Sequence, residues 1–467
     1  MSDSSEPVRP APRSVIMPLT VAGGLFMEGL DSTIIATSLP QMARSLEVSP
    51  TYLSLAITSY LLSLAVFTPI SGWLADRFGG RRLYCFAIAA FTVSSALCAL
   101  SPNLEFLVAT RILQGVAGAL MAPVARLILL RSFPKSDYIK ATNYMVMPAL
   151  IGPMAGPVVG GFITEYFSWR WIFLINIPIG IASIHLILRL VQEVPARRPP
   201  PFDFPGFVIV GAGFAMAQFW LECVGRNIIA VSAQIVLFAG SVAAFFGYRQ
   251  YARGHPNPAL DLKLFSIPSF SISVLWGSVA RMGIGASPFL LPLLFQVGFG
   301  FDPFHAGILM FVSTSGAFFM RVGFSRVIRI WGLRRVLVLN SAILAVMLPG
   351  FILFHAATSH WLLVSYVFLF GFMRSIQFLS LSLLSYADLT VETISKGTSI
   401  FTVGQRLSMG AGVAVAGGLL TIFASGNAKI METDFHPVFA ILGLFELIAL
   451  WGFWRLHPMA GREITGA

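Results

Sequence analysis

The stretch FMEGLDSTIIATSLP, residues 26–40, holds two carboxylates in an otherwise apolar run. Glu28 and Asp31 have no Lys or Arg nearer along the chain than Arg13 before them and Arg44 after them. Isolated charges are costly in a lipid bilayer, and they are kept there mainly where a protein uses them. Whether this stretch crosses a bilayer therefore decides how the rest of the sequence is interpreted.

The composition of the chain favours a membrane protein. Of the 467 residues, 56% are hydrophobic and 11% are charged, and the mean hydropathy is +0.81. Globular domains carry about 25% charged residues, so a soluble protein of this length could not bury so much apolar surface. Long apolar runs recur from end to end, which predicts a polytopic helical protein. The net charge of +11 does not indicate a nucleic-acid partner, because the basic residues fall between these runs.

Fourteen membrane-spanning helices are predicted, each about as long as the 20 residues that cross a bilayer. They cover residues 15–38, 51–75, 82–100, 104–130, 139–165, 170–190, 204–224, 229–248, 268–294, 304–328, 334–355, 361–384, 396–424 and 435–457. An even number of spans places both termini on one side. Only Arg44, Arg170, Arg226 and Lys429 fall on the opposite side. The positive-inside rule therefore predicts that both termini are cytoplasmic.

A Pro- and Arg-rich linker, PARRPPPFDFP at residues 195–205, follows the first six spans. We predict a 6+2+6 arrangement of the helices. Its parts are a cytoplasmic tail (1–14), a six-helix bundle (15–190), the cytoplasmic linker (191–203), two extra spans (204–248), a second cytoplasmic linker (249–267), a six-helix bundle (268–457) and a cytoplasmic tail (458–467).

The two six-helix bundles share a weak internal repeat. GWLADRFGGRR at residues 72–82 is echoed by SRVIRIWGLRR at residues 325–335, in which Arg329 stands opposite Asp76. Duplicated six-helix halves are typical of transporters, with the substrate site near mid-membrane between them.

Other chemistries have little support in the sequence. Cys85, Cys98 and Cys223 are too few and too scattered for a disulfide framework or a metal site. No phosphate-binding loop of the GxxxxGK[ST] kind is present, so we expect no ATP-driven step. The seven His are dispersed and no soluble sensing domain is evident, which argues against a membrane enzyme or a receptor.

Five motifs resemble those of the major facilitator superfamily. GWLADRFGGRR resembles its signature loop, RILQGVAGA (111–119) its fourth-helix motif, and GPMAGPVVGG (152–161) the fifth-helix motif associated with antiporters. LDSTIIATSLP (30–40) and WRWIFLINIPIG (169–180) are similar to motifs of the fourteen-helix drug:proton antiporters, the EmrB/QacA-like branch. The resemblance covers nearly the whole chain.

This resemblance implies an all-α major facilitator fold in a bacterial inner membrane. It implies an exporter of small molecules that works by alternating access and is driven by the proton gradient. It implies no cofactor, a monomer, and protons, lipid and substrate as the partners. The residues to which it assigns a cytoplasmic gate are Gly72, Asp76, Arg77, Gly79, Arg81 and Arg82, and those of the antiporter motif are Gly152, Gly156, Pro157, Gly160 and Gly161.

The motif residues also have a direct physical interpretation. Gly152, Gly156 and Gly160 recur every four residues and share one helix face, so another helix can approach closely. Ordinary membrane packing would use the same spacing. Asp76 would pair with the arginines of its loop or with a helix N-terminus, as a latch that opens when the halves move. The alternative is a topology anchor, which explains the arginines but not the acid.

The two acids of the first span are the candidates for proton coupling. Glu28 and Asp31 are three residues apart and share a helix face. Asp31 and Arg111 each lie about seven residues from the outer ends of their spans, so they can pair if the helices are neighbours. One arginine cannot neutralise two buried carboxylates, so at least one acid should exchange protons. We assign proton coupling to Asp31, Glu28 and Arg111; the alternative is a purely structural Asp31–Arg111 pair.

The last six spans hold arginines without matching acids. Arg281 and Arg374 fall near mid-span, and Arg406 lies in the cytoplasmic half of its helix. Together with Gln114 and Gln377 they are our candidates for substrate binding. Such a cavity could bind an anionic metabolite or a metal chelate as well as a lipophilic cation, and the sequence does not name the substrate. A nutrient importer on the same fold is a further alternative.

Overall fold

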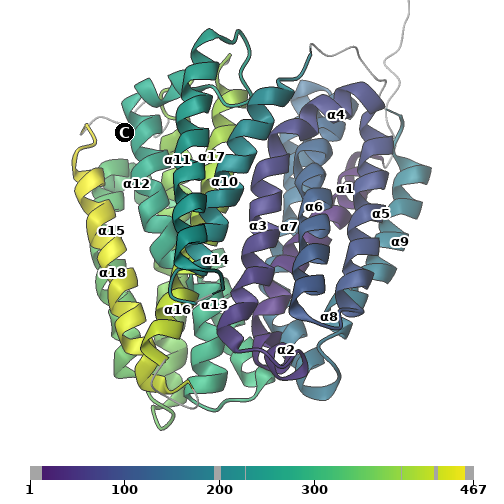
Figure 1. Ribbon diagram of the computed structural model, residues 1–467. Coiled ribbons are helices and arrows are strands. Elements are labelled where there is room, and N and C mark those ends of the chain that lie inside the picture. Colours follow the sequence, from purple (N-terminus) through teal and green to yellow (C-terminus); the bar gives the residue numbers. More distant parts are fainter. Residues whose placement is uncertain (1–12, 194–200, 227, 391, 425–429, 458–467) are drawn as a thin grey trace, which may run out of the picture.

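The computed structural model describes residues 13–193, 201–226, 228–390, 392–424 and 430–457. Every regular element in these residues is a helix, and fourteen helical segments are long and apolar enough to cross a membrane. The prediction of an all-α protein with fourteen spans is therefore confirmed. The helices stand side by side as a bundle (Figure 1). Residues 1–12 and 458–467 of the predicted tails, and residues 194–200 of the linker, lie outside the described residues.

The element bounds follow the chain in three groups. The first six spans are α1 (Arg13–Ile34) with η1 (Ile35–Ser38) and α2 (Leu39–Ser45); η2 (Pro50–Leu53), α3 (Ser54–Phe67), η3 (Thr68–Ile70) and α4 (Ser71–Phe78); α5 (Gly80–Ala99); α6 (Leu104–Ser132); α7 (Lys135–Tyr166); and α8 (Trp171–Leu174) with α9 (Asn176–Leu190). Two spans follow, α10 (Phe204–Cys223) and α11 (Val231–Gly254). After η4 (Leu262–Ser266), the last six are α12 (Pro268–Gly285) with α13 (Ser287–Leu293) and η5 (Leu294–Gly298); α14 (Pro303–Trp331); α15 (Leu333–Gly350) with η6 (Phe351–Leu353); α16 (His360–Tyr386); α17 (Ile394–Ala424); and α18 (Glu432–Trp454).

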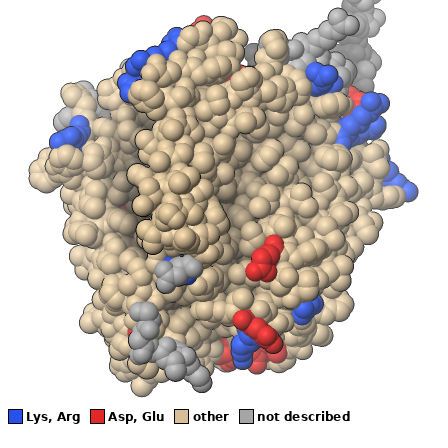
Figure 2. Space-filling view, viewed as in Figure 1, with Lys and Arg blue, Asp and Glu red and all other residues tan. Residues whose placement is uncertain are grey.

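Each span reverses the chain, so α1 begins and α18 ends at the same end of the bundle. We call this end, at the top of Figure 1, the α4 end, and the opposite one the α2 end. Most of the Lys and Arg visible in Figure 2 lie towards the α4 end, and the middle of this face carries little charge. We keep the terms N-terminal half for α1–α9 and C-terminal half for α12–α18, as in the predicted division.

Proline interrupts three of the spans. Pro40 lies in the first turn of α2, Pro69 lies in η3 between α3 and α4, and Pro292 lies inside α13. Proline has no backbone N–H to donate and its ring crowds the preceding turn, so a helix bends or restarts there. Each of these three spans is built from shorter consecutive helical segments.

The internal repeat has a backbone counterpart. Gly79 links α4 to α5 with a φ of 90°, and Gly332 links α14 to α15 with a φ of 73°. This left-handed region is open to glycine and strained for other residues. The two halves therefore turn in the same way at the loop where their sequences resemble each other.

The extra helices are anchored at the α4 end by Asp203. Its carboxylate accepts hydrogen bonds from the Tyr251 hydroxyl (2.6 Å) and from the backbone N–H groups of Gly206 and Ala259 (both 2.9 Å). Burial alone would raise the pKa of Asp203, but these hydrogen bonds outweigh it and lower the pKa below its usual range. The carboxylate thus caps α10 in its charged form and ties it to α11.

The buried core shows which end of the bundle is closed. At the α2 end one apolar cluster contains residues of both halves, such as Leu39 and Phe173 of the first and Phe289 and Leu420 of the second. At the α4 end the fully buried residues of the two halves belong to separate clusters. The structure therefore holds the halves together at the α2 end.

Candidate functional site

A fully buried ion pair lies at the centre of the N-terminal half. Arg111 of α6 donates from Nη1 to Oδ2 of Asp31 on α1 at 2.6 Å, and the two side chains are 1% and 0% exposed. Oδ1 of Asp31 accepts from Gln114 (2.9 Å) and from Asn176 of α9 (3.1 Å). The predicted pairing of Asp31 with Arg111 is thus observed, and both oxygens of the carboxylate are satisfied.

Two nitrogens of the Arg111 guanidinium, Nη1 and Nε, have further acceptors. Its Nη1 donates to Oε1 of Gln114 (2.7 Å) and its Nε to the backbone oxygen of Ala56 (3.2 Å). Its central carbon lies 4.2 Å from the centre of the Tyr60 ring, which adds a cation–π contact. Buried pairs are stable only when their other hydrogen-bonding groups find partners, and here both carboxylate oxygens and the Nη1 and Nε groups of Arg111 have them.

Gln114 and Asn176 both bond to Asp31, which the sequence analysis did not predict. We expected Gln114 to contact substrate, but it is fully buried and serves as a ligand of Asp31 and Arg111. Sequence reasoning missed Asn176, although it is the one polar side chain after Arg170 in the motif WRWIFLINIPIG. An amide inside such a run indicates a buried hydrogen-bonding partner, and that signal could have identified it.

Glu28 pairs with an arginine of the opposite half. Arg406 of α17 donates from Nη2 to Oε1 of Glu28 at 3.1 Å, and the side chains are 31% and 10% exposed. Glu28 lies one helical turn from Asp31, so the two carboxylates are compensated by arginines on different halves. Glu28 and Arg406 are 378 residues apart, so the sequence alone could not show that they pair.

Unlike Arg406, Arg281 and Arg374 of the C-terminal half have no carboxylate partner among the described residues. Arg374 of α16 donates from Nη1 to the hydroxyl of Ser287 on α13 at 3.0 Å and is partly exposed. Arg281 of α12 is fully buried and donates to the hydroxyl of Ser408 at 3.2 Å. Within the part of the chain that the structure describes, neither guanidinium lies in an ion pair.

Two candidates for substrate contact lie in the protein interior. Arg281 was expected to face the cavity, but its guanidinium packs 5.0 Å from the centre of the Phe401 ring, between α12 and α17. Gln377 is also fully buried, and it bonds to Ser341 and Asn340 of α15, both at 2.8 Å. Neither side chain is open to a substrate in this state, because each has been taken up by helix packing. Arg374 and Arg406 are the accessible ones.

The signature loop forms its ion pairs with residues outside it. Asp76 of α4 pairs with Arg131 at the end of α6. Arg81 and Arg82 approach the carboxylate of Glu193 at 3.2 and 3.5 Å. Two partners were predicted for Asp76, the arginines of its own loop or a helix N-terminus; in the described residues its ion pair is with neither of these but with Arg131. These contacts join α4 to α6, and α5 to the segment just after α9.

The glycines of α7 allow the acid-bearing helix to approach. A methyl group on Gly156 would lie 2.1 Å from the Thr33 hydroxyl oxygen of α1, and one on Gly152 would lie 2.5 Å from the Phe26 carbonyl oxygen. Gly161 faces the other half, where a methyl group would lie 2.4 Å from the Pro303 carbonyl oxygen of α14. The motif thus brings α7 against α1, and against α14 of the other half.

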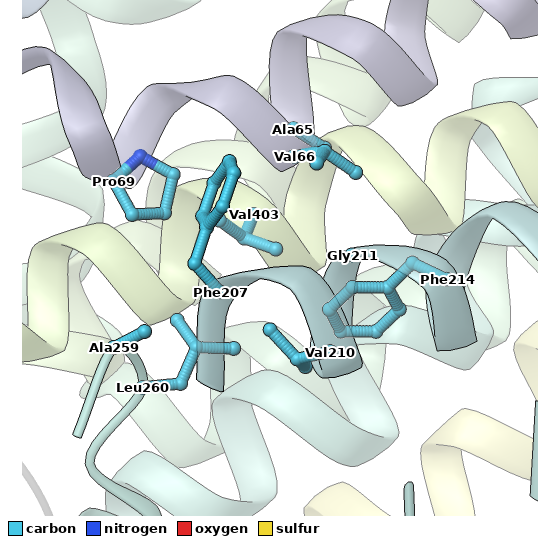
Figure 3. A pocket seen from close by; sticks show the side chains of 10 residues that line it. All are labelled: Ala65, Val66, Pro69, Phe207, Val210, Gly211, Phe214, Ala259, Leu260 and Val403. Atoms are coloured by element: carbon cyan, nitrogen blue, oxygen red, sulfur yellow. The ribbon is translucent and has the colours of Figure 1, made fainter. Parts of the chain in front are cut away.

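An apolar pocket lies away from these charges. It is formed between α3, α10, α17 and the segment that follows α11, and Figure 3 shows its side chains. Its lining contains none of the candidate residues. The charged groups of Glu28, Asp31 and their partners therefore form a site that is separate from this pocket.

The fold and this constellation define a class of protein, the membrane transporters built from two helical halves around a central charged site. The family model of the Major Facilitator Superfamily matches residues 21–413. The chain belongs to this superfamily, and it is a transporter rather than an enzyme.

Curated relatives include the "Putative multidrug resistance protein MdtD" of Cronobacter sakazakii, which is 38% identical over 421 residues (90% of this chain and 89% of the relative). The protein of the same description from Salmonella typhi is 38% identical over 423 residues, with the same shares covered. The fold is similar to that of a D-xylose–proton symporter (TM-score 0.68, 14% identity, 96% of this chain and 98% of that one). With its fourteen spans and bacterial relatives, the chain is a multi-pass protein of the inner membrane.

Proposed function

We propose that this protein is a proton-coupled exporter of small molecules that works by alternating access, with the α4 end facing the cytoplasm. The observation that carries the proposal is the Glu28–Arg406 ion pair, which joins the two halves one helical turn from Asp31. A proton on Glu28 removes one charge of this pair and weakens the link between the halves. Proton occupancy and the relative position of the halves are then coupled.

Asp31 and Glu28 have different parts in this scheme. Asp31 is held by three partners of its own half, so it keeps the N-terminal half in one arrangement and sets the local charge. Glu28 has a single described partner, the half-buried Arg406. Water and protons therefore reach Glu28 more readily than Asp31. We infer that Glu28 exchanges the transported proton and that Asp31 and Arg111 control the field around it.

The substrate of the leading proposal is a drug-like molecule. The relatives at 38% identity are described as putative multidrug resistance proteins, and a lipophilic cation would find a counter-charge in Glu28 once Arg406 is displaced. Because the bundle is closed at the α2 end, substrate would enter from the α4 end. That end is proposed to face the cytoplasm, so this is the direction of loading that an exporter requires.

An anionic substrate is the second candidate, and one observation favours it. Arg374 is partly exposed, and the partner described for it is the neutral hydroxyl of Ser287. A carboxylate of a metabolite or of a metal chelate would replace the neutral Ser287 hydroxyl as the acceptor of the hydrogen bond from Arg374. A charge-assisted hydrogen bond of this kind contributes roughly 1.5–3 kcal/mol.

Transport in proteoliposomes with an imposed pH gradient tests the proposal. Purified protein should exchange protons for substrate, so a panel of cationic dyes and of organic anions is screened for uptake driven by the gradient. The control is the same preparation with the gradient collapsed by a protonophore. Uptake that is equal with and without the gradient, for every compound that is transported, would contradict proton coupling.

A further inference from the structure

Helix α10, the first of the two extra helices, ends in a buried ion pair. Glu222 and Arg226 are spaced i,i+4 at the α2 end, and their side chains are 2% and 0% exposed. A charged pair in the interior is costly unless its other hydrogen-bonding groups find partners. Nε of Arg226 has no partner in the described residues, and the other groups find theirs on helices at both sides of α10.

The N-terminal half contributes three hydroxyl groups. Ser54 and Thr58 of α3 donate to the two carboxylate oxygens of Glu222, at 2.9 and 2.5 Å. The Tyr52 hydroxyl donates to the backbone oxygen of Arg226 at 2.9 Å. All three bonds join η2 and α3 to the end of α10.

The C-terminal half packs closely against the same turn at the end of α10, which contains Val224 and Arg226. Arg226 donates from Nη2 to the backbone oxygen of Ala414 on α17 at 3.3 Å. A methyl group on Gly417 would lie 1.9 Å from that nitrogen, and one on Gly418 would lie 2.6 Å from the Val224 carbonyl oxygen. The end of α10 therefore fits closely against two glycines of α17.

The same three helices meet differently at the α4 end. There α3, α10 and α17 surround the pocket in Figure 3, and every residue that lines it is apolar. The polar network of Glu222 and Arg226 is at the α2 end, where the two halves share their core. The network thus coincides with the end of the bundle that is closed.

We propose that Glu222 and Arg226 lock α3 to α17 at the α2 end, so that the extra helices take part in the transport cycle. The inference rests on the alternating access proposed above and is independent of the substrate. When the α2 end opens, the hydroxyl bonds from α3 to Glu222 break and water replaces them. The pair stays with α17, because Gly417 and Gly418 hold α10 by close packing.

The test removes the hydroxyl groups and leaves the ion pair intact. The variant is Ser54→Ala/Thr58→Val. The control is Ser59→Ala. In the described residues the Ser59 hydroxyl bonds only to the carbonyl of Ala56, in its own helix.

Spin labels at Ser45→Cys and Ala356→Cys, exposed positions at the α2 ends of the two halves, report the opening by pulsed electron paramagnetic resonance. The three native cysteines are replaced by serine, and this background is first shown to transport.

Ser54→Ala/Thr58→Val should raise the population with long distances at the α2 end roughly fivefold, and Ser59→Ala should not change it. The neutral double variant Glu222→Gln/Arg226→Gln should act in the same direction. If the parent shows a long-distance population that the hydroxyl variant leaves unchanged, the lock is overturned while alternating access stands. If neither protein opens at any pH, with or without a transported compound, alternating access at this end is wrong and the lock is overturned with it.

Discussion

In the N-terminal half a guanidinium on α6 reaches a carboxylate on the first helix of that half, Arg111 to Asp31 at 2.6 Å. In the C-terminal half a guanidinium on α16 also reaches the first span of its half, but it meets a hydroxyl, Arg374 to Ser287 at 3.0 Å. The Asp31–Arg111 pair is balanced within one half. In the other half Arg374 is in no ion pair among the described residues, while Arg406 pairs with Glu28 across the interface. In the function proposed here, proton exchange falls to the carboxylates of the N-terminal half, and selection of substrate charge falls to Arg374 of the C-terminal half.

The largest effect is expected from breaking the balanced half. Asp31→Asn should abolish substrate accumulation driven by a pH gradient, because it removes an acid and leaves Arg111 buried without a counter-charge. Loss of one partner of a buried pair costs about 3–5 kcal/mol. The measurement is uptake into vesicles, normalised to the amount of inserted protein.

The double variant Asp31→Asn/Arg111→Gln is the matched control for Asp31→Asn. It removes both charges, so it should insert and fold better than the single variant while remaining inactive. Accumulation at the parental level in either variant would place the coupling site elsewhere.

A smaller loss is expected where the two halves meet. Glu28→Gln should end accumulation against a gradient, because it removes the acid proposed to exchange the proton, but it should leave downhill uptake, because the buried Asp31–Arg111 pair remains. Arg406→Gln should have a similar effect, and the double variant should be no worse than either single one, since both remove the same interaction. Initial rates of proton-driven uptake provide the measurement. Additive losses in the double variant would show that the pair does not act as a unit.

Arg374→Gln tests the unbalanced half. It should weaken the binding of an anionic substrate by about 1.5–3 kcal/mol, which is roughly 10- to 150-fold in affinity. Cationic dyes should be transported as before or slightly better. Competition for uptake between an anion and a dye measures both.

The control for Arg374→Gln is Arg281→Gln. This residue is fully buried between helices, so its replacement should lower thermal stability and leave the order of substrate preference unchanged. Equal transport of every anion by Arg374→Gln and the parent would leave the cation exporter as the better proposal.

Ser287→Asp would make the C-terminal half resemble the N-terminal half. The new carboxylate should pair with Arg374, reduce anion binding about tenfold and favour cations, because it neutralises the charge. Ser287→Asn, which has nearly the same shape and no charge, is its control. The ratio of cation to anion uptake is the measurement, and an unchanged ratio in Ser287→Asp would mean that Arg374 does not contact the substrate.

The smallest effect concerns the loops at the α4 end, where Asp76 of one half corresponds to Arg329 of the other. Asp76→Asn should slow turnover about 2- to 5-fold with little change in substrate affinity, since partly exposed ion pairs contribute up to about 1 kcal/mol. Arg131→Gln should match it. Steady-state uptake kinetics separate the maximal rate from the apparent affinity, and a loss of affinity alone would argue against a gating role.

Much of the fold could be predicted from the sequence. The length and polarity of each apolar run give fourteen spans, because a bilayer sets both a minimum length and a penalty for charge. The depth of Asp31 and Arg111 in their spans predicted their pairing, and the four-residue spacing of Gly152, Gly156 and Gly160 predicted a close helix contact. These are properties of single helices or of neighbouring helices placed at a matched depth.

Only the tertiary structure decided which arginines are accessible and which groups join the halves. Arg281 and Arg374 both fall near mid-span in the sequence, yet one is packed between α12 and α17 and the other is partly exposed. The partners of Glu28 and Glu222 lie on helices distant along the chain, Arg406 on α17 and Ser54 on α3. Helix periodicity fixes the face on which a side chain lies, but the identity of the helix opposite depends on how all the spans pack.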